Sequence, residues 1–275
     1  MSNPEIAKSI KTGNFKTNYH DLGEGKDVIL FIHGSGPGVS AFANWRLCMP
    51  ALAKKFRVIA PDMVGFGYTD RPAKVSYDMD TWVQQTIDLM DALGIEKTNL
   101  VGNSFGGALA LALAIKYPDR FNKIVLMGAV GVYFDLTYGL DKAWGYTPSI
   151  ENMKELLDIF AYDRSIVTDD LAKMRYEASI RPGFQESFSA MFPAPRQSGV
   201  DSMESCENDI KKIDKETLII HGREDKVIPV QNSIRLNQLI KTSQLHIFGE
   251  CGHWTQIEHN ERFNTLLLNF FSENK

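Results

Sequence analysis

A serine flanked by glycines is the side chain of this sequence with the clearest capacity for chemistry. Ser104 lies in the run Gly102 to Gly106 (GNSFG), directly after a short apolar run and before the helix-forming stretch 108–115. A strand, a turn tight enough to require glycine and then a helix form the setting of a nucleophile elbow, which exposes the serine hydroxyl. The pattern predicts a nucleophile at Ser104. The alternative is a Gly/Ser turn that only packs a helix against a sheet, so the partners of Ser104 must decide.

Those partners are found in two loops in the second half of the chain. Asp225 and His253 each follow an apolar run with the composition of a buried strand. Ligands of parallel sheets bind at the carboxyl ends of the strands, where these loops lie. The order serine, aspartate, histidine is the chain order of α/β-hydrolases. We therefore expect His253 to accept the Ser104 proton while Asp225 fixes its tautomer. Glu224 is a competing acid, and the shorter Asp225 suits a tight loop better.

A glycine-rich loop at 33–38 (HGSGPG) follows the first apolar run of the chain. In this position such a loop supplies one backbone N–H to an oxyanion hole, and the N–H of Phe105, the residue after the nucleophile, supplies another. A phosphate-binding loop is the alternative. It is disfavoured because no Gly-Lys-Ser/Thr follows and the glycine spacing is not that of a dinucleotide-binding loop.

The elements around these loops alternate between strand and helix. Apolar runs predict strands at 28–32, 57–60, 100–101, 124–127, 218–221 and 245–248, and amphipathic patterns predict helices at 80–93, 106–116, 232–241 and 260–271. This alternation predicts an α/β fold with a mostly parallel, doubly wound sheet. Segment 134–208 has prolines and no clear strand. We interpret it as a helical cap inserted between core parts 1–133 and 209–275, rather than as a separate helical domain.

Composition and charge exclude several classes of protein. The net charge is −4 and no block of lysine or arginine stands out, which argues against a nucleic-acid partner. The longest apolar stretch, 108–115, is far shorter than the ~20 residues of a membrane span, and the polar N-terminus does not resemble a signal peptide. Three scattered cysteines indicate reduced thiols in a cytoplasmic protein rather than disulfides or a metal site. Neither a metal nor an organic cofactor is expected.

The motifs together resemble the meta-cleavage product hydrolases, α/β-hydrolases that break a C–C bond in ring-fission products of aromatic compounds. The similarity is greatest to the 2-hydroxymuconic semialdehyde and alkyl-substituted branch. The segments that carry it are 33–38 (HGSGPG), 43–46 (ANWR), 61–67 (PDMVGFG), 102–107 (GNSFGG), 180–184 (IRPGF), 221–225 (HGRED) and 252–254 (GHW). The resemblance implies an α/β-hydrolase fold with a helical cap, a 2-hydroxy-6-oxo-2,4-dienoate substrate and a homo-oligomer.

The resemblance also implies roles for further residues. Arg181 would hold the substrate carboxylate, with Asn44, Asn103 and Trp254 around it, and Ser35 would stand near the oxyanion. Val130 and Val227 would line the acyl pocket, and a β-branched Val130 would favour a hydrogen, methyl or short alkyl group over phenyl. The substrate-binding residues expected are Gly34, Gly36, Asn44, Asn103, Val130, Arg181, Val227 and Trp254. A carboxylesterase and a non-enzymatic ligand-binding protein of the same fold remain the alternatives.

Overall fold

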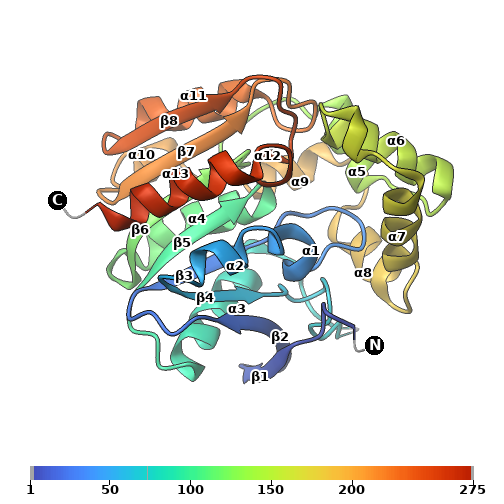
Figure 1. Cartoon of the computed structure of the whole chain (residues 1–275). Helices are drawn as coiled ribbons and strands as arrows, with labels where there is room; N and C mark the ends of the chain where they lie inside the picture. The colour runs from blue at the N-terminus through green and yellow to red at the C-terminus, as the bar shows by residue number, and fades with distance from the viewer. Residues whose placement is uncertain (1–2, 73, 274–275) are drawn as a thin grey trace.

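The centre of the molecule is one eight-stranded sheet (Figure 1). The computed structural model describes residues 3–72 and 74–273. The strands follow the order β1-β2-β4-β3-β5-β6-β7-β8. β1 pairs antiparallel with β2, and β2 with β4, whereas all other neighbours are parallel. The strands are β1 (Lys8–Thr12), β2 (Phe15–Leu22), β3 (Val28–Ile32), β4 (Arg57–Pro61), β5 (Thr98–Asn103), β6 (Phe121–Met127), β7 (Glu216–Gly222) and β8 (Ser243–Phe248). The predicted α/β class and mostly parallel sheet are confirmed.

All six predicted strands are present, but the sequence analysis missed the hairpin β1–β2. Its strands are not apolar runs. Thr17, Asn18 and His20 in β2 are buried polar residues, and the hydroxyls of Thr12 and Thr17 lie 2.7 Å apart. Thr12 and Thr17 pair with each other, and Asn18 donates to Asp62 Oδ2 and to the Glu5 carbonyl oxygen. Because the buried residues of the hairpin are polar, they form no apolar run, and periodicity alone does not reveal the strands.

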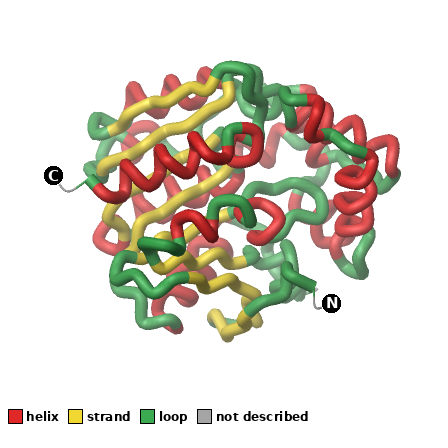
Figure 2. Tube along the Cα trace, viewed as in Figure 1, coloured by secondary structure: helices red, strands yellow, loops and turns green. Residues whose placement is uncertain are grey.

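Helices cover both faces of the sheet (Figures 1 and 2). One apolar core lies between the sheet and α3, α4 and α11, and the other lies between the sheet and α1, α2 and α13. This is the doubly wound arrangement predicted from the sequence. The helices outside the β6–β7 segment are α1 (Ala41–Trp45), α2 (Met49–Leu52), α3 (Met79–Ala92), α4 (Phe105–Lys116), η1 (Pro118–Arg120), α11 (Val230–Leu239), α12 (Thr255–Glu258) and α13 (Asn260–Ser272).

The chain between β6 and β7 is helical throughout its regular parts. Thr137, Ser149 and Thr168 cap three of its helices by accepting a backbone N–H with their side chains. Figure 1 shows α5 to α8 gathered beyond one end of the sheet strands, apart from the helices that cover its faces. The segment holds α5 (Tyr138–Trp144), α6 (Ile150–Phe160), η2 (Arg164–Ile166), α7 (Asp169–Ser179), α8 (Phe184–Met191), α9 (Gln197–Ser202) and α10 (Glu207–Ile210).

Candidate active site

Ser104 stands on a sharp turn between β5 and α4. Its φ of 55° and ψ of −114° lie in a region that costs a non-glycine residue about 1–3 kcal/mol. The neighbouring glycines make this turn possible. A Cβ at Gly102 would lie 2.1 Å from the Gly106 carbonyl oxygen, and a Cβ at Gly106 would lie 2.5 Å from the carbonyl oxygen of Ile32. The sequence motif is therefore a nucleophile elbow in its geometry.

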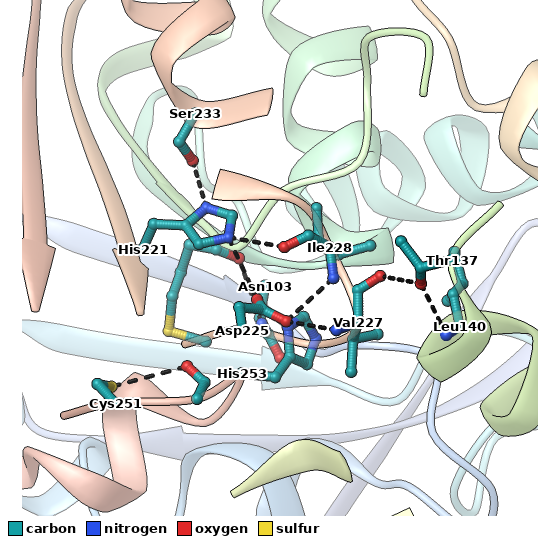
Figure 3. Close-up of polar contacts among 12 residues, drawn as sticks. Asn103, Thr137, Leu140, His221, Asp225, Val227, Ile228, Ser233, Cys251 and His253 are labelled. Carbon is teal, nitrogen blue, oxygen red and sulfur yellow. Dashed lines mark hydrogen bonds and ion pairs between the residues drawn. The ribbon is translucent and has the colours of Figure 1, made fainter. Parts of the chain in front are cut away.

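His253 and Asp225 meet at the carboxyl ends of β7 and β8 (Figure 3). The Nδ1 of His253 lies 2.7 Å from Asp225 Oδ2, and both side chains are buried. The same carboxylate oxygen lies 3.2 Å from Nε2 of His221, a residue that the sequence analysis had placed in a strand without a role. Nε2 of His221 also lies 3.0 Å from the Ile228 carbonyl oxygen, so this nitrogen carries the proton and donates. Asp225 thus serves two histidines.

The other oxygen of Asp225 is held by the backbone. Oδ1 accepts the N–H groups of Val227 at 2.7 Å and Ile228 at 3.0 Å. Burial alone would raise the pKa of the Asp225 carboxyl, but the charges and hydrogen bonds of His253 and His221 outweigh it and hold this pKa well below its ordinary value. Asp225 is therefore a carboxylate whose charge faces His253.

Glu224, the competing acid, points elsewhere. Its carboxylate accepts the backbone N–H of Cys251 at 3.0 Å and pairs with Arg223 at 2.8 Å. It therefore fixes the loop that carries His253 without facing the imidazole. The backbone N–H of His253 donates to the carbonyl oxygen of Phe160, at the end of α6, at 2.8 Å. The histidine is thus positioned jointly by the loop after β8 and by the β6–β7 insertion.

A cavity of ≈ 230 Å³ lies over Ser104 and His253. It is lined by residues of the sheet ends on one side and by α5, α6 and α7 on the other. Most of the site residues predicted from the sequence line it. These are Gly34, Ser35, Gly36, Asn44, Asn103, Ser104, Val227, His253 and Trp254.

The polar groups beside Ser104 are arranged by hydrogen bonds. The Ser35 oxygen accepts the indole N–H of Trp144 at 3.0 Å, which leaves the Ser35 hydroxyl proton free to donate. The Gly34 N–H donates to Asn44 Oδ1 at 3.2 Å, and Asn103 Nδ2 donates to the Met127 carbonyl oxygen at 3.3 Å.

Phe105 contributes only its backbone to this arrangement. Its ring is fully buried and is not among the residues that line the cavity. Its N–H is the first of α4, and such a group has no acceptor within its own helix. It is therefore free to face an oxyanion beside Ser104.

The structure does not bring Arg181 to the cavity. Its guanidinium Nη1 pairs with Glu5 at 2.8 Å and lies near the rings of Tyr68 and Phe184, with centroids at 5.2 and 5.7 Å. The residue follows the end of α7 in the turn before α8. Its charge is paired with Glu5 and it is not among the cavity-lining residues, so its role at the substrate carboxylate stays a prediction without support from this geometry.

Arg175 lines the cavity instead. It is half-buried, its Nη2 donates to the Pro37 carbonyl oxygen at 3.0 Å, and burial lowers the pKa of its guanidinium to about 10. Sequence reasoning missed it because α7 is polar and shows little amphipathic pattern. A signal was available, since Leu171 and Arg175 are spaced i, i+4 and so share one helix face, and both line the cavity.

Val130, predicted to line the acyl pocket, lies directly behind Ser104. It is fully buried and donates its N–H to the Ser104 carbonyl oxygen at 3.2 Å, but it is not among the cavity-lining residues. Its hydrogen bond therefore helps to hold the backbone of the nucleophile elbow. The apolar wall comes from Val227 and from α5 and α6, with Leu140, Ala143, Met153, Leu157 and Phe160.

Within residues 3–72 and 74–273, no three metal-ligating side chains gather in one place. The donor set around Ser104 is instead one imidazole, amides, hydroxyls and two guanidinium groups. These groups can accept a proton and bind anions.

Comparison with known proteins places this geometry in a family. Residues 27–260 match the family described as alpha/beta hydrolase fold. The chain is 57% identical over 270 residues to the 2-hydroxy-6-oxo-2,4-heptadienoate hydrolase of Pseudomonas putida strain F1, with 98% of each chain covered. It is also 57% identical over 273 residues to the 2-hydroxymuconate semialdehyde hydrolase of Pseudomonas sp. strain CF600, covering 99% of this chain and 96% of the relative.

A solved structure gives the same result. The crystal structure of a variant of the meta-cleavage product hydrolase CumD shares 63% identity with this chain. It superposes with a TM-score of 0.98 over 99% of this chain and 100% of the other. The agreement extends over the sheet and the whole β6–β7 insertion. The chain therefore belongs to the α/β-hydrolase fold family and, within it, to the meta-cleavage product hydrolases.

Proposed function

We propose that this protein hydrolyses a C–C bond of 2-hydroxy-6-oxo-2,4-dienoates, giving 2-hydroxypenta-2,4-dienoate and a small carboxylic acid. One observation carries the proposal beyond the names of the relatives. The cavity over Ser104 and His253 holds a guanidinium, that of Arg175, without a carboxylate partner among the described residues. A generic esterase does not need such a cation in its acyl site, whereas a substrate with a terminal carboxylate does.

The cavity supports one orientation of the substrate. The carboxylate would bind Arg175 through charge-assisted hydrogen bonds, beside the amides of Asn44 and Asn103 and the ring of Trp254. Carbon-6 would then lie over Ser104. Its substituent would face the apolar wall, where the Thr137 hydroxyl fixes Val227 by donating to the Val227 carbonyl oxygen at 2.7 Å (Figure 3).

The triad then performs two proton transfers. Ketonisation of the dienol, with His253 moving the proton from O2 to C5, creates the electron sink that C–C cleavage needs. Attack on the C6 carbonyl follows, either by Ser104 or by a water molecule activated by His253. The Phe105 N–H and the Ser35 hydroxyl stabilise the oxyanion. When the C5–C6 bond breaks, the electron pair stays with the dienoate fragment, and water supplies the remaining hydrogen and hydroxyl.

We further propose that the β6–β7 insertion is a cap that selects the acyl group. Leu140, Met153, Leu157 and Phe160 come from its helices and are buried or nearly so. Their apolar side chains suit a hydrogen, methyl or short alkyl group at C6. The short-acyl expectation rests on this wall, and the role predicted for Val130 stays a prediction.

Turnover of two substrates tests the function and the acyl preference together. The protein is mixed with 2-hydroxy-6-oxohepta-2,4-dienoate or with its 6-phenyl analogue, and loss of the yellow dienol colour is followed. We expect faster decay of the 6-methyl compound. A preference for phenyl would keep the reaction and refute the acyl assignment. Cleavage of p-nitrophenyl esters with no dienoate decay would favour a carboxylesterase, and binding without any turnover would favour a non-enzymatic protein.

A pair of arginine variants tests the carboxylate site. Arg175→Gln should raise KM for the dienoate by roughly tenfold or more, because a charge-assisted contact is lost, and should leave hydrolysis of neutral esters within about twofold. Arg181→Gln is the matched control from the same part of the cap, and its dienoate KM should not change. Equal losses on both substrates in Arg175→Gln would contradict a carboxylate contact.

Two further properties complete the proposal. None of the helices in the described part of the chain has both the length and the hydropathy of a membrane span. The three unpaired cysteines support a cytoplasmic site of action, and family membership supports a homo-oligomer. Cell fractionation and light scattering of the purified protein test these two points, and a monomer at micromolar concentration would contradict the second.

A further inference from the structure

Among residues 3–72 and 74–273, most arginines are neutralised by a neighbouring carboxylate, and two that have no such partner there line the cavity. Seven of the eleven form such pairs, namely Arg57, Arg120, Arg164, Arg181, Arg196, Arg223 and Arg235. Arg71 and Arg262 lie over the rings of Phe184 and Phe248. The remaining two, Arg46 and Arg175, both line the cavity over Ser104.

Solvent exposure divides the cavity lining into a floor and a rim. On the floor, Ser104 and His253 are only 4% and 6% exposed. Most half-buried lining residues lie in or next to α1, α7 and α12, so the cavity meets solvent on this side. The rim consists of Gly36, Ala43, Asn44, Arg46, Ile166, Leu171, Arg175, Trp254 and Ile257. Both arginines belong to this rim, with the guanidinium of Arg46 the more accessible and that of Arg175 the more deeply buried.

The opening carries excess positive charge. No aspartate, glutamate or lysine is among the residues that line the cavity within the described chain. Burial lowers the pKa of both Arg46 and Arg175, and the charge of Arg46 lowers that of Arg175 further, so the two cations lie close enough to repel each other. Glu5 is the acid that acts on both, and its own carboxylate is paired with Arg181.

The two arginines are held differently. Arg175 reaches across from α7 and donates to Pro37 in the glycine-rich loop. Arg46 directly follows α1, and its Nη1 donates to the Ala43 carbonyl oxygen at 2.7 Å, one turn back. Arg46 is thus anchored to its own helix at the rim, while Arg175 links cap and core.

We propose that Arg46 draws the anionic substrate into the cavity, whereas Arg175 holds it once bound. This inference rests on the proposed function, which supplies the anion. The protein as a whole has a net charge of −4 and repels anions at long range. A local positive opening offsets that repulsion and raises the rate of association, an effect that salt screens.

Stopped-flow binding to a variant that cannot turn over separates these roles. In a Ser104→Ala background, 2-hydroxy-6-oxohepta-2,4-dienoate is mixed with protein at about 20 mM and about 300 mM salt. Adding Arg46→Gln should lower the association rate constant roughly two- to fivefold at low salt, flatten its salt dependence and leave the dissociation rate constant within about twofold. Arg46→Lys should restore association, because it keeps the charge.

Two matched variants complete the test. Arg175→Gln should act mainly on dissociation, raising its rate constant roughly tenfold, and Arg181→Gln should alter neither constant. An unchanged association rate in Arg46→Gln would overturn the proposal. So would a rise in dissociation equal to that of Arg175→Gln, because Arg46 would then be a direct contact. Failure of the parent to bind any dienoate would instead refute the proposed function itself.

Discussion

Replacing Asp225 by asparagine is the sharpest test of the catalytic geometry. In the wild type, Oδ2 accepts hydrogen bonds from His253 Nδ1 and His221 Nε2, while Oδ1 accepts two backbone N–H groups. All four partners are donors. Asparagine keeps one acceptor oxygen and gains an NH₂ group, so it cannot serve both sets.

The structure indicates which function is lost. If the amide oxygen stays with the backbone N–H groups of Val227 and Ile228, the NH₂ group meets two donating imidazoles. His253 must then present an unprotonated Nδ1 and carry its proton on Nε2, where it cannot accept one from Ser104. The same change in an unrelated serine hydrolase costs about 10⁴ in kcat, which corresponds to about 5 kcal/mol of transition-state stabilisation. We expect a loss of about 10³- to 10⁴-fold here.

The assay is steady-state dienoate hydrolysis, with circular dichroism to show that the variant is folded. Glu224→Gln is the matched control, since it lies next in sequence, keeps an acceptor for the Cys251 N–H and does not face His253. Its kcat should stay within about threefold of wild type. Retention of more than about a tenth of kcat by Asp225→Asn would refute the reasoning, as would an equal loss in Glu224→Gln.

Three further predictions follow from single contacts. Ser104→Ala should lower kcat by up to about 10⁶-fold, while the variant still binds the dienoate. Near-normal turnover by this variant would refute the assignment of Ser104 as nucleophile. Burial lowers the pKa of His33 to about 4, so folding is opposed by protonation of this histidine in the unfolded chain below pH 6.5. Urea titrations should show wild type losing up to about 3 kcal/mol more of its unfolding free energy than His33→Gln between pH 6.5 and 4. An equal pH dependence of the unfolding free energy in the two proteins would contradict this. Gly128 has φ +50°, and an added Cβ would lie 3.3 Å from the His253 ring. Gly128→Ala should therefore displace the imidazole and lower kcat roughly tenfold. An unchanged kcat would contradict this, because the ring would then keep its catalytic position.

The arrangement of Ser104, Asp225 and His253 was easier to predict from the sequence than that of the residues around them. Ser104, Asp225 and His253 each follow a strand, and local glycines mark their loops, so position in the alternating pattern was enough. The choice between Arg175 and Arg181 depended on which face of a polar helix meets the cavity, and hydrophobic periodicity is weak there. The hairpin β1–β2 was missed for a related reason, because several of its buried residues are polar and form no apolar run.

His221 and Arg46 show a second limit. A histidine within an apolar strand is ordinarily read as a packing residue, and its contact with Asp225 depends on the turn that follows β7. An arginine after a five-residue helix lies in no hydrophobic pattern that would place it at a cavity opening. The roles of these two residues depend on which charged groups lie beside them in the folded protein. Hydrophobic periodicity along the chain does not indicate such tertiary contacts.

The crowding around the elbow has a consequence for engineering this enzyme toward new substrates. Since a side chain at Gly102 or Gly106 would meet backbone carbonyl oxygens at 2.1–2.5 Å, saturation libraries at these positions should return only glycine among active clones. The apolar side chains that α5 and α6 present to the cavity are less constrained, because a change in their volume is taken up by the cavity and not by backbone. Diversity in a directed-evolution experiment therefore belongs in the cap, where the acyl group can change while the machinery that cleaves it stays fixed.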